Sequence, residues 1–474
     1  MAKVVFFFLY MFILLYGQFG RKVKKAASWE ECKELCQDRQ LRRRASTALL
    51  LGVMGLELIL NLVNFGVNFT FTNITNYPHQ TDYTASIIRY MKEREKDNPF
   101  YRAEVTHAKT LNDGALNSYN GISTFTSSAN VATTEFMQCL GAAAYNSWNR
   151  YCYEESSPVS NLFLNLKYLV ERDYATDGNA YFDVVLAENG LTLMENNAYL
   201  PLGFLADSAL ADLDFSTSNR SFAFQNRLFQ DATGTKKNVW KALVTRDVSV
   251  TATEDVKLNQ TNLSGYTSFS TGATGGTLTY TLTIPYEGYL CLDLNLGQNK
   301  NYTVWHNGQY LFSKNYSLSQ LLGIDNVQVG DTVEVRVNCA VNQSSSSVNI
   351  RAAVLQEEIF REGYEILNAS TLQLSQCTTS LIQGSIDCNR EGLLYLSVPQ
   401  DGNWAAYVDG EKAEIQLVGD CMIGLMLTEG RHDVELCYEN TAFSLGARIS
   451  GGCALIFTLF VITDLLIQRK NKKK

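Results

Sequence analysis

Three long apolar runs divide the chain. They cover residues 1–20, 47–65 and 446–468, and each approaches the roughly 20 residues that a helix needs to cross a bilayer. Lys and Arg are concentrated in 21–46 and 469–474, which the positive-inside rule places in the cytoplasm. We therefore predict three transmembrane helices, a basic cytoplasmic loop and tail, and a large part outside the cell, between the second and third helices.

The first run has an alternative interpretation as a cleaved signal peptide with Lys3 as its basic end. We favour a membrane helix, because the heavier positive charge follows the run and no small-x-small cleavage motif precedes it. The second run carries Glu57, Asn61 and Asn64 on one helical face. Such a face is costly against lipid, so we expect it to meet other membrane helices, including those of a polytopic partner subunit.

Residues 66–238 mix two periodicities, which predicts an α/β domain. Helical spacing is found at Asp82–Lys96, Glu135–Tyr145, Asn161–Glu171 and Phe222–Ala232, and alternation at Phe100–Thr106 and within Asn179–Asn197. After Val239 helical patterns disappear, and short Thr-, Val- and Tyr-rich stretches alternate with Gly, Asn and Asp turns. This pattern is typical of antiparallel β-sandwiches.

An internal repeat divides the second half of the chain into two modules, 239–358 and 359–445. Three pairs of motifs match: Tyr280–Gly288 with Leu394–Gly402, Trp305–Gly308 with Tyr407–Gly410, and the glycines Gly330 and Gly430 with the Val-Glu pairs that follow them. Asn-Gly and Asp-Gly in the second pair predict two-residue hairpin turns. The predicted fold is thus α+β and membrane-anchored, with three transmembrane helices, a mixed α/β domain and tandem antiparallel sandwiches.

The stretch 112–130 fits neither a long helix nor a strand. Asp113-Gly114 and Asn120-Gly121 predict turns in which glycine adopts positive φ. Polar groups held on such a loop often build a sugar pocket, although from composition alone an ordered loop that satisfies its own backbone is the favoured explanation. The candidate substrate-binding residues are Asn112, Asp113, Tyr119, Asn120, Ser123 and, from the 222–232 helix, Asn226.

The cysteines and histidines do not indicate a catalytic or metal site. An even number of cysteines is expected outside the cell, and loop length makes the disulfides Cys139–Cys152 and Cys377–Cys388 plausible. The four histidines have no ligand spacing, so no metal site is predicted. The chain has a net charge of −8, and its basic residues are concentrated in the cytoplasmic segments. The acidic exterior does not suit nucleic acid.

Several short motifs, in order, resemble the extracytoplasmic part of the bacterial YfhO membrane-protein family. They are Phe100–Glu104, Asn112-Asp113, Tyr119–Ser123, Pro201–Phe204, Phe224–Asn226, Leu396–Pro399, Val408–Gly410 and Gly430–His432. The resemblance covers most of 47–470. It implies a multi-pass protein of the bacterial plasma membrane, of the GT-C glycosyltransferase type.

The resemblance further implies sugar addition to surface polymers such as lipoteichoic acid, from a polyprenyl-phosphate-linked donor. The family's catalytic carboxylate lies in an outer loop of a many-helix bundle, and no residue here matches it, so the catalytic residues are unknown. Glu104, Asp113 and Glu135 lie near the polar loop, but no spacing selects an acid/base pair. We expect a partner that supplies further helices. The alternative is a non-catalytic, membrane-anchored protein that binds a cell-surface glycopolymer.

Overall fold

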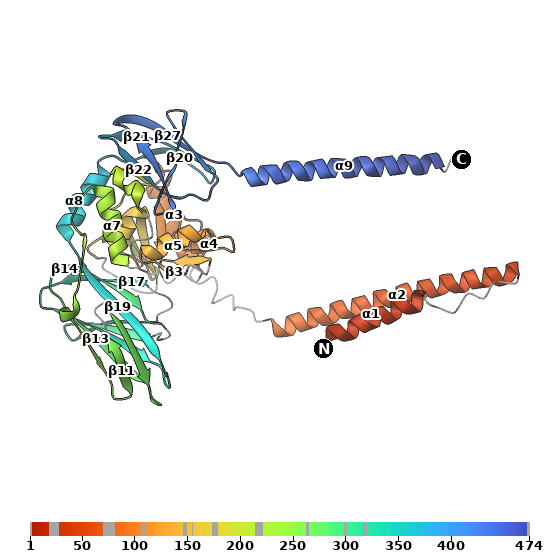
Figure 1. The fold of residues 1–474 in the computed structure, drawn as a ribbon, viewed down its shortest axis with the longest axis horizontal. Coiled ribbons are helices and arrows are strands. Elements are labelled where there is room, and N and C mark those ends of the chain that lie inside the picture. The colour runs from red at the N-terminus through yellow and green to blue at the C-terminus, as the bar shows by residue number, and fades with distance from the viewer. Residues whose placement is uncertain are drawn as a thin grey trace. The chain divides into compact units, whose positions relative to one another are not determined.

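The computed structural model has two compact units, Met1–His79 and Gln80–Lys474, and their ribbons are shown in Figure 1. The structure describes residues 2–18, 28–69, 81–106, 110–145, 149–153, 155–172, 179–213, 221–261, 265–297, 299, 301–315 and 320–471. Each unit is described by itself.

The first unit is a pair of helices. Helix α1 (Ala2–Gln18) lies alongside α2 (Trp29–Asn68). The Tyr10 hydroxyl donates a hydrogen bond to the Glu57 carboxylate, and Ser46 Oγ donates to the Ile13 carbonyl at 3.2 Å. Glu57 therefore has a partner within the chain, whereas Asn61 and Asn64 on the same face are exposed.

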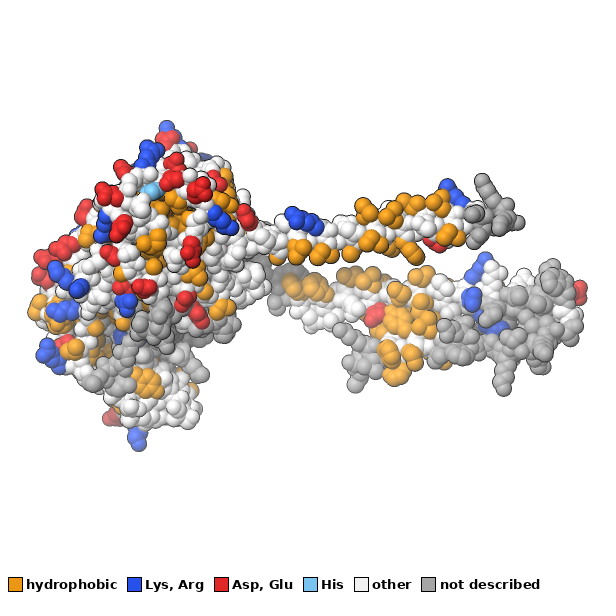
Figure 2. All heavy atoms as spheres, turned by 45° about the horizontal axis from the view of Figure 1, so that its top comes forward, with side chains coloured by type: hydrophobic (Ala, Val, Ile, Leu, Met, Phe, Trp, Pro, Cys, Tyr) orange, Lys and Arg blue, Asp and Glu red, His pale blue; other side chains and the backbone are white. Residues whose placement is uncertain are grey.

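Among the described residues, two helical stretches are long and apolar enough to cross a membrane, Gln40–Asn68 and Thr441–Arg469. The latter belongs to α9 (Thr441–Asn471). Apolar side chains are exposed along both long helices, as Figure 2 shows. Helix α1 has 17 residues, and the prediction that this first run also spans the membrane is not confirmed.

The second unit begins with a four-stranded sheet in the order β1-β5-β7-β6. Its strands are β1 (Arg102–Val105), β5 (Leu166–Arg172), β6 (Phe182–Glu188) and β7 (Leu191–Asn196). Helix α3 (Thr81–Arg94) covers one face, because Ile87, Ile88 and Met91 recur at helical spacing and pack on the sheet. The helix predicted at 161–171 is wrong, because α6 (Pro158–Phe163) ends at Phe163 and most of the remaining residues form β5, which is buried along most of its length.

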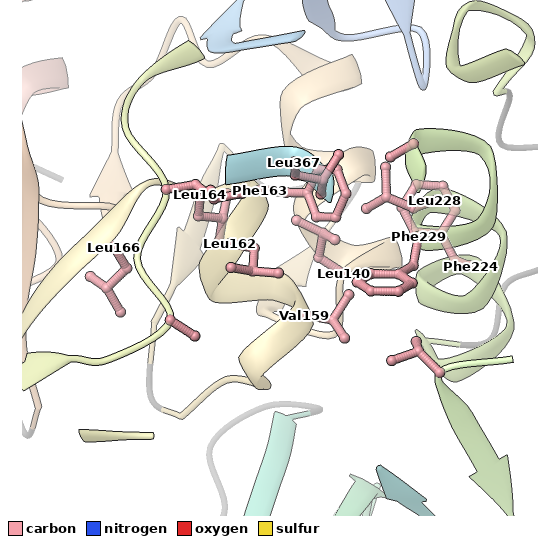
Figure 3. Close-up of a cluster of buried hydrophobic side chains, with 14 of the residues drawn as sticks. Leu140, Val159, Leu162, Phe163, Leu164, Leu166, Phe224, Leu228, Phe229 and Leu367 are labelled. Carbon is pink, nitrogen blue, oxygen red and sulfur yellow. The ribbon is translucent and has the colours of Figure 1, made fainter. Parts of the chain in front are cut away.

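A large apolar core lies on the other side of this sheet. Helices α5 (Val131–Cys139), α6 and α7 (Ser221–Thr233) contribute to it, together with the small sheet of β2 (Thr124–Phe125), β3 (Ala143–Tyr145) and β4 (Arg150–Cys152). Figure 3 shows Phe224 and Phe229 of α7 directed toward Leu140 and Val159. The helix predicted at 135–145 therefore ends at 139, and its last three residues form β3.

Residues 240–355 form two sheets around one core. The first has the order β10-β13-β18-β15-β16, and the second β11-β12-β19-β14-β17, with β9 beside β19. The first sheet contains β10 (Val248–Ala252), β13 (Gly276–Thr283), β18 (Thr332–Cys339), β15 (Asn301–His306) and β16 (Gln309–Asn315). The second contains β9 (Trp240–Ala242), β11 (Val256–Thr261), β12 (Tyr266–Thr271), β19 (Ser346–Leu355), β14 (Gly288–Asn295) and β17 (Gln320–Val327).

Two further sheets are built mainly from strands that follow α8 (Glu357–Asn368). No helix was predicted after Val239, and α8 corrects this: it buries Phe360, Gly363 and Leu367 on one face. One sheet has the order β20-β21-β27-β23-β24 and the other β25-β26-β22-β8. Their strands are β20 (Gln373–Cys377), β21 (Leu381–Cys388), β27 (Gly430–Tyr438), β23 (Trp404–Val408), β24 (Glu411–Ala413), β25 (Gln416–Val418), β26 (Met422–Leu427), β22 (Gly392–Pro399) and β8 (Gly203–Ala206).

The two five-stranded sheets have the same order, because β10-β13-β18-β15-β16 corresponds strand by strand to β20-β21-β27-β23-β24. Both predicted hairpin turns have the positive φ of two-residue hairpins, at Asn307-Gly308 and Asp409-Gly410. The motif match of Tyr280–Gly288 with Leu394–Gly402 differs from the topology, since β13 corresponds to β21. Strand β8, from the predicted α/β domain, also pairs with β22, so the expected domains are not separate.

The two predicted disulfides are not formed in the structure, in which Cys139, Cys377 and Cys388 are free thiols. Cys377 pairs across β20 and β21 with Ile382. Cys388 lies six residues farther along β21, roughly 20 Å away at the usual rise of a strand. Loop length alone suggested this pair, and the hairpin register prevents it.

Candidate functional site

The polar loop begins as a short helix, α4 (Asp113–Asn117), and continues to β2. Neither Gly114 nor Gly121 has positive φ; the left-handed residue is Ser118, at 63°. The glycines are needed for close packing instead. A Cβ on Gly114 would lie 2.9 Å from the Tyr119 carbonyl oxygen, and one on Gly121 would lie 3.2 Å from the Tyr119 ring.

The side-chain amides of three predicted binding residues form hydrogen bonds with backbone groups of the protein. Asn112 Nδ2 donates to the Phe125 carbonyl at 3.0 Å, and its Oδ1 accepts from the Phe125 amide at 2.8 Å. Asn120 donates to the Tyr101 carbonyl. Asn226 lies elsewhere, on α7, where it makes the same two-way contact with the backbone of Trp240. These amides hold the chain in place.

Glu104 organises the remainder of the loop. Its Oε2 accepts hydrogen bonds from the backbone amides of Ile122 at 2.6 Å and Ser123 at 2.9 Å. The side chain is 1% exposed. Burial, opposed by these amides and reinforced by the charge of Asp113, raises the pKa of Glu104 to about 7. Ser123 Oγ also accepts from the Tyr153 amide at 2.9 Å, which connects the loop to β4.

Asp113, at the start of α4, is the second buried carboxylate. Its Oδ2 accepts from the Tyr119 hydroxyl at 2.9 Å and from Asn117 Nδ2 at 3.0 Å. Its Oδ1 lies 3.9 Å from Arg172, whose guanidinium donates to Thr84 at 3.2 Å. Burial and the two neighbouring carboxylates raise the pKa of Tyr119 well above its usual value. The structure thus joins two of the predicted binding residues, Asp113 and Tyr119, in a closed interior cluster.

A polar pocket of about 240 Å³ lies on the opposite face of β5 from Arg172. Leu169 and Glu171 of β5 form one wall, because alternate residues of a strand face the same side. Two other walls come from the segment before α6, with Glu155, and from β14 and β17. The lining also includes Thr106, Tyr153, Ser156, Pro158, Asn161, Asn179, Tyr181, Phe182, Met194, Tyr289, Gly323 and Asp325.

The wall from β14 and β17 presents a carboxylate and a phenol. Asp325 Oδ2 accepts from the Ala180 amide at 3.0 Å, whereas its buried Oδ1 has no hydrogen-bond partner among the described residues. Burial raises the pKa of Asp325. The Tyr289 hydroxyl occupies space that only a glycine leaves open, since a Cβ on Gly323 would lie 1.8 Å from it.

The remaining lining groups are held by hydrogen bonds. The Tyr153 hydroxyl donates to Asn161 Oδ1 at 3.1 Å, and the Tyr181 hydroxyl donates to Glu357. Glu155 forms an ion pair with Lys314 of β16. Sequence reasoning missed this pocket, because residues from 106 to 325 meet there and no local motif joins them.

A second cavity, of about 450 Å³, has a mainly apolar lining that includes Phe222, Trp240, Val248 and Ile350, and Asn226 is also among its lining residues. Asn226 is thus the one predicted site residue that borders it. No group of three or more His, Cys, Asp or Glu residues in the described part of the chain could hold a metal ion.

Comparison with solved structures gives only partial likenesses. The low-affinity xylan-binding module CBM86 from Roseburia intestinalis is 13% identical; the match covers 24% of this chain and 98% of the module, with a TM-score of 0.16. A GH2 beta-galacturonidase from Eisenbergiella tayi is 12% identical over 42% of this chain and 36% of that enzyme, with a TM-score of 0.17. TM-scores this low carry no argument about this chain.

Comparison with curated proteins gives no match. The family described as "Bacterial membrane protein YfhO" matches residues 1–450, which include the polar loop, the pocket and both β-rich parts. This match confirms the resemblance carried by the short motifs. The chain belongs to the YfhO family of bacterial membrane proteins.

Proposed function

We propose that this chain takes part in the extracytoplasmic glycosylation of cell-surface polymers, and that its polar pocket binds a sugar residue of the acceptor polymer. The observation that carries the proposal is the pocket between β5, β14 and β17, where aromatic rings and hydrogen-bonding side chains surround one small cavity. Its membrane location rests on the family and on the two apolar helices.

The lining suits a sugar ring in two respects. Tyr153, Tyr181, Phe182 and Tyr289 offer the apolar and aromatic surface on which a ring's C–H face packs. Carboxyl, amide and hydroxyl groups between them can bond several ring hydroxyls at once. The volume of about 240 Å³ is below the range of roughly 300–1,000 Å³ for drug-sized ligands, so it suits a single sugar ring of a longer chain.

The family resemblance supplies the remainder of the proposal. The donor is a polyprenyl-phosphate-linked sugar, the acceptor is a polymer of the lipoteichoic-acid type, and a polytopic membrane partner binds the donor lipid. The large part of the chain lies outside the bacterial plasma membrane, with 21–46 and 469–474 inside. Buried Glu104 and Asp113 are bonded to backbone amides and to Tyr119. We therefore assign them to the scaffold, and we assign no residue to sugar transfer.

The proposal is tested with the full chain in detergent and a delipidated surface polymer. Asp325→Asn keeps an acceptor for the Ala180 amide but replaces the unpartnered oxygen with N–H donors, and Glu171→Gln removes the charge from the β5 wall. Both should weaken polymer binding at least tenfold, whereas Asp387→Asn, exposed on β21, should not. Unchanged binding in both pocket variants, with melting unchanged, would reject the pocket as the binding site.

An experiment in cells distinguishes a role in glycosylation from a role in glycan binding alone. If the chain serves glycosylation, Asp325→Asn should lower the sugar content of the surface polymer while the protein remains in the membrane at its normal amount. If the chain only binds glycan, the polymer retains its sugars and the cells lose only the association between polymer and protein.

A further inference from the structure

Helix α9 follows the second β-rich part without a long linker. Strand β27 ends at Tyr438 and α9 begins at Thr441, so at most about 11 Å of chain joins them. The connection is hydrogen-bonded, because the Glu439 amide donates to the Asn403 carbonyl at 2.7 Å and the Thr441 amide donates to the Glu439 carbonyl at 2.8 Å. The end of the sheet that carries Tyr438 therefore stays close to the start of α9.

The sequence of α9 indicates the height of its first turn above the bilayer. The first charged residue is Arg448, and an uncharged stretch follows it up to Thr463. A basic side chain near the end of a membrane helix extends to the lipid headgroups, and Thr441 precedes Arg448 by about 10 Å of helix. Between them, Phe443 and Leu445 are 74% and 58% exposed. Since the headgroup layer of one leaflet is roughly 5–7 Å thick, Thr441 lies at or just beyond this layer when α9 crosses the bilayer.

Two aromatic side chains lie at this end of the sheet. The rings of Trp404 and Tyr438 pack edge to face, with centroids 5.1 Å apart. The Tyr438 hydroxyl donates to Asp401 at 2.5 Å and accepts from Asn403 at 3.2 Å. Trp and Tyr are enriched at the membrane–water interface, because each has an apolar ring and a polar group. The chain connection to α9 thus holds this pair where contact with lipid headgroups is favourable.

The polar loop extends to the same end of the sheet. Gln400 Nε2 donates to the Trp404 carbonyl at 3.1 Å, and the Gln400 carbonyl accepts from Asn130 Nδ2 at 3.2 Å. Near Asn130 the chain exposes two large apolar side chains, Phe125 at 47% and Val131 at 58%. The residues between these two carry no charge and include three hydroxyl groups. Such a segment can enter the headgroup layer without the desolvation of a charged side chain.

We propose that Phe125, Val131 and the Trp404–Tyr438 pair form a lipid-facing edge, which rests on the leaflet from which α9 emerges. Continuity with α9 favours lipid over a soluble partner, because a surface joined so closely to a membrane helix has headgroups beside it. The segments of the edge, 125–131, 400–404 and 438–441, contain no Lys or Arg. The contact therefore depends on aromatic and apolar groups and does not require anionic lipid. The inference does not depend on the sugar pocket, and it places one end of the polar loop at the membrane surface.

Photo-crosslinking of the full chain in phosphatidylcholine vesicles tests the edge. The photoreactive residue p-benzoylphenylalanine replaces Phe125 or Val131, and the adducts are identified by mass spectrometry. The control position is Asp387, which is exposed on β21 and pairs with Arg431. Arg431 lies seven residues before Tyr438 on β27, roughly 23 Å away at the usual rise of a strand. Lipid adducts should be at least fivefold more abundant at Phe125 and Val131 than at Asp387.

The lipid composition and the identity of the adducts decide the outcome. Replacing part of the phosphatidylcholine with anionic phosphatidylglycerol should leave the ratio between test and control positions unchanged. Equal lipid adducts at all three positions, no lipid adduct at Phe125 and Val131, or adducts there only with a second protein chain would each overturn the inference. So would a preference that arises only with the anionic lipid. If the replacement at Phe125 does not fold, Val131, the exposed first residue of α5, decides.

Discussion

Glu104 makes the stability of the 112–130 loop depend on pH in a direction opposite to that of most carboxylates. Its carboxyl group is fully buried, and its pKa is raised from an ordinary value of 4.5 to about 7. The folded protein therefore retains a proton that the unfolded chain has released between these two pH values. Stability from this group is greatest below pH 4.5 and falls as the pH rises through 7.

The size of the effect follows from the two pKa values. Between pH 5 and pH 8, proton linkage with pKa values of 4.5 unfolded and about 7 folded lowers the free energy of opening by about 2.5 kcal/mol, roughly 70-fold in the opening equilibrium. Glu104→Gln resembles the protonated form, because its amide oxygen can accept from Ile122 and Ser123. This variant should lack the effect.

Hydrogen exchange of the full chain measures the effect locally. Protection of the amides in 119–125, corrected for the pH dependence of intrinsic exchange, should fall between pH 5 and pH 8 in the wild type and remain nearly constant in Glu104→Gln. Glu135→Gln on α5, outside the amides that are followed, should behave as the wild type. Equal pH dependence in the wild type and Glu104→Gln would refute the assignment of the proton to Glu104.

Three further predictions concern topology and packing. An epitope inserted at the exposed Asp409–Gly410 turn should be detected on intact cells, and one within 21–27 only after permeabilisation; the reverse pattern would invert the proposed orientation. Gly363→Ala should destabilise the chain by about 1–3 kcal/mol in urea unfolding, because the new Cβ would lie 2.2 Å from the Phe229 ring; no change would show that α8 is loosely packed. Asn226→Ala should also destabilise it by about 1–3 kcal/mol, since two buried backbone groups lose their partner, without changing polymer binding. Lost binding at unchanged stability would restore Asn226 as a ligand contact.

Local sequence patterns predicted the elements whose structure depends on local interactions. The i, i+3, i+4 pattern of Ile87, Ile88 and Met91 located α3, and the Asn-Gly and Asp-Gly pairs located two hairpins, because both signals act within a few residues. The stretch Leu166–Arg172 was wrongly predicted as helical, since five of its seven residues are Leu, Lys, Glu or Arg, which favour helices. It forms a strand because it pairs with β1 and β7, and pairing with strands that are distant in the sequence produces no local sequence pattern.

The candidate site was predictable only in its outline. The composition of 112–130 indicated an ordered polar loop, and Asp113 and Tyr119 do meet. Their partner Arg172 lies nearly sixty residues farther along the chain, and Asp325 reaches the pocket from another sheet. A single sequence contains no signal for such long-range contacts, because they depend on how β5, β14 and β17 are placed in space.

The polar loop and the polar pocket are therefore connected in the structure but have different roles. The polar groups of the loop form hydrogen bonds within the protein. Asn112 donates to the Phe125 carbonyl, Asp113 accepts from Tyr119, and the backbone amides of Ile122 and Ser123 donate to Glu104. A loop that has satisfied its own donors and acceptors has few left for a ligand. Its contact from Ser123 Oγ to the Tyr153 amide nevertheless fixes a residue that lines the pocket. Residues of the loop should consequently affect sugar binding through the position of Tyr153, whereas Asp325, whose Oδ1 has no partner among the described residues, should affect it by direct contact.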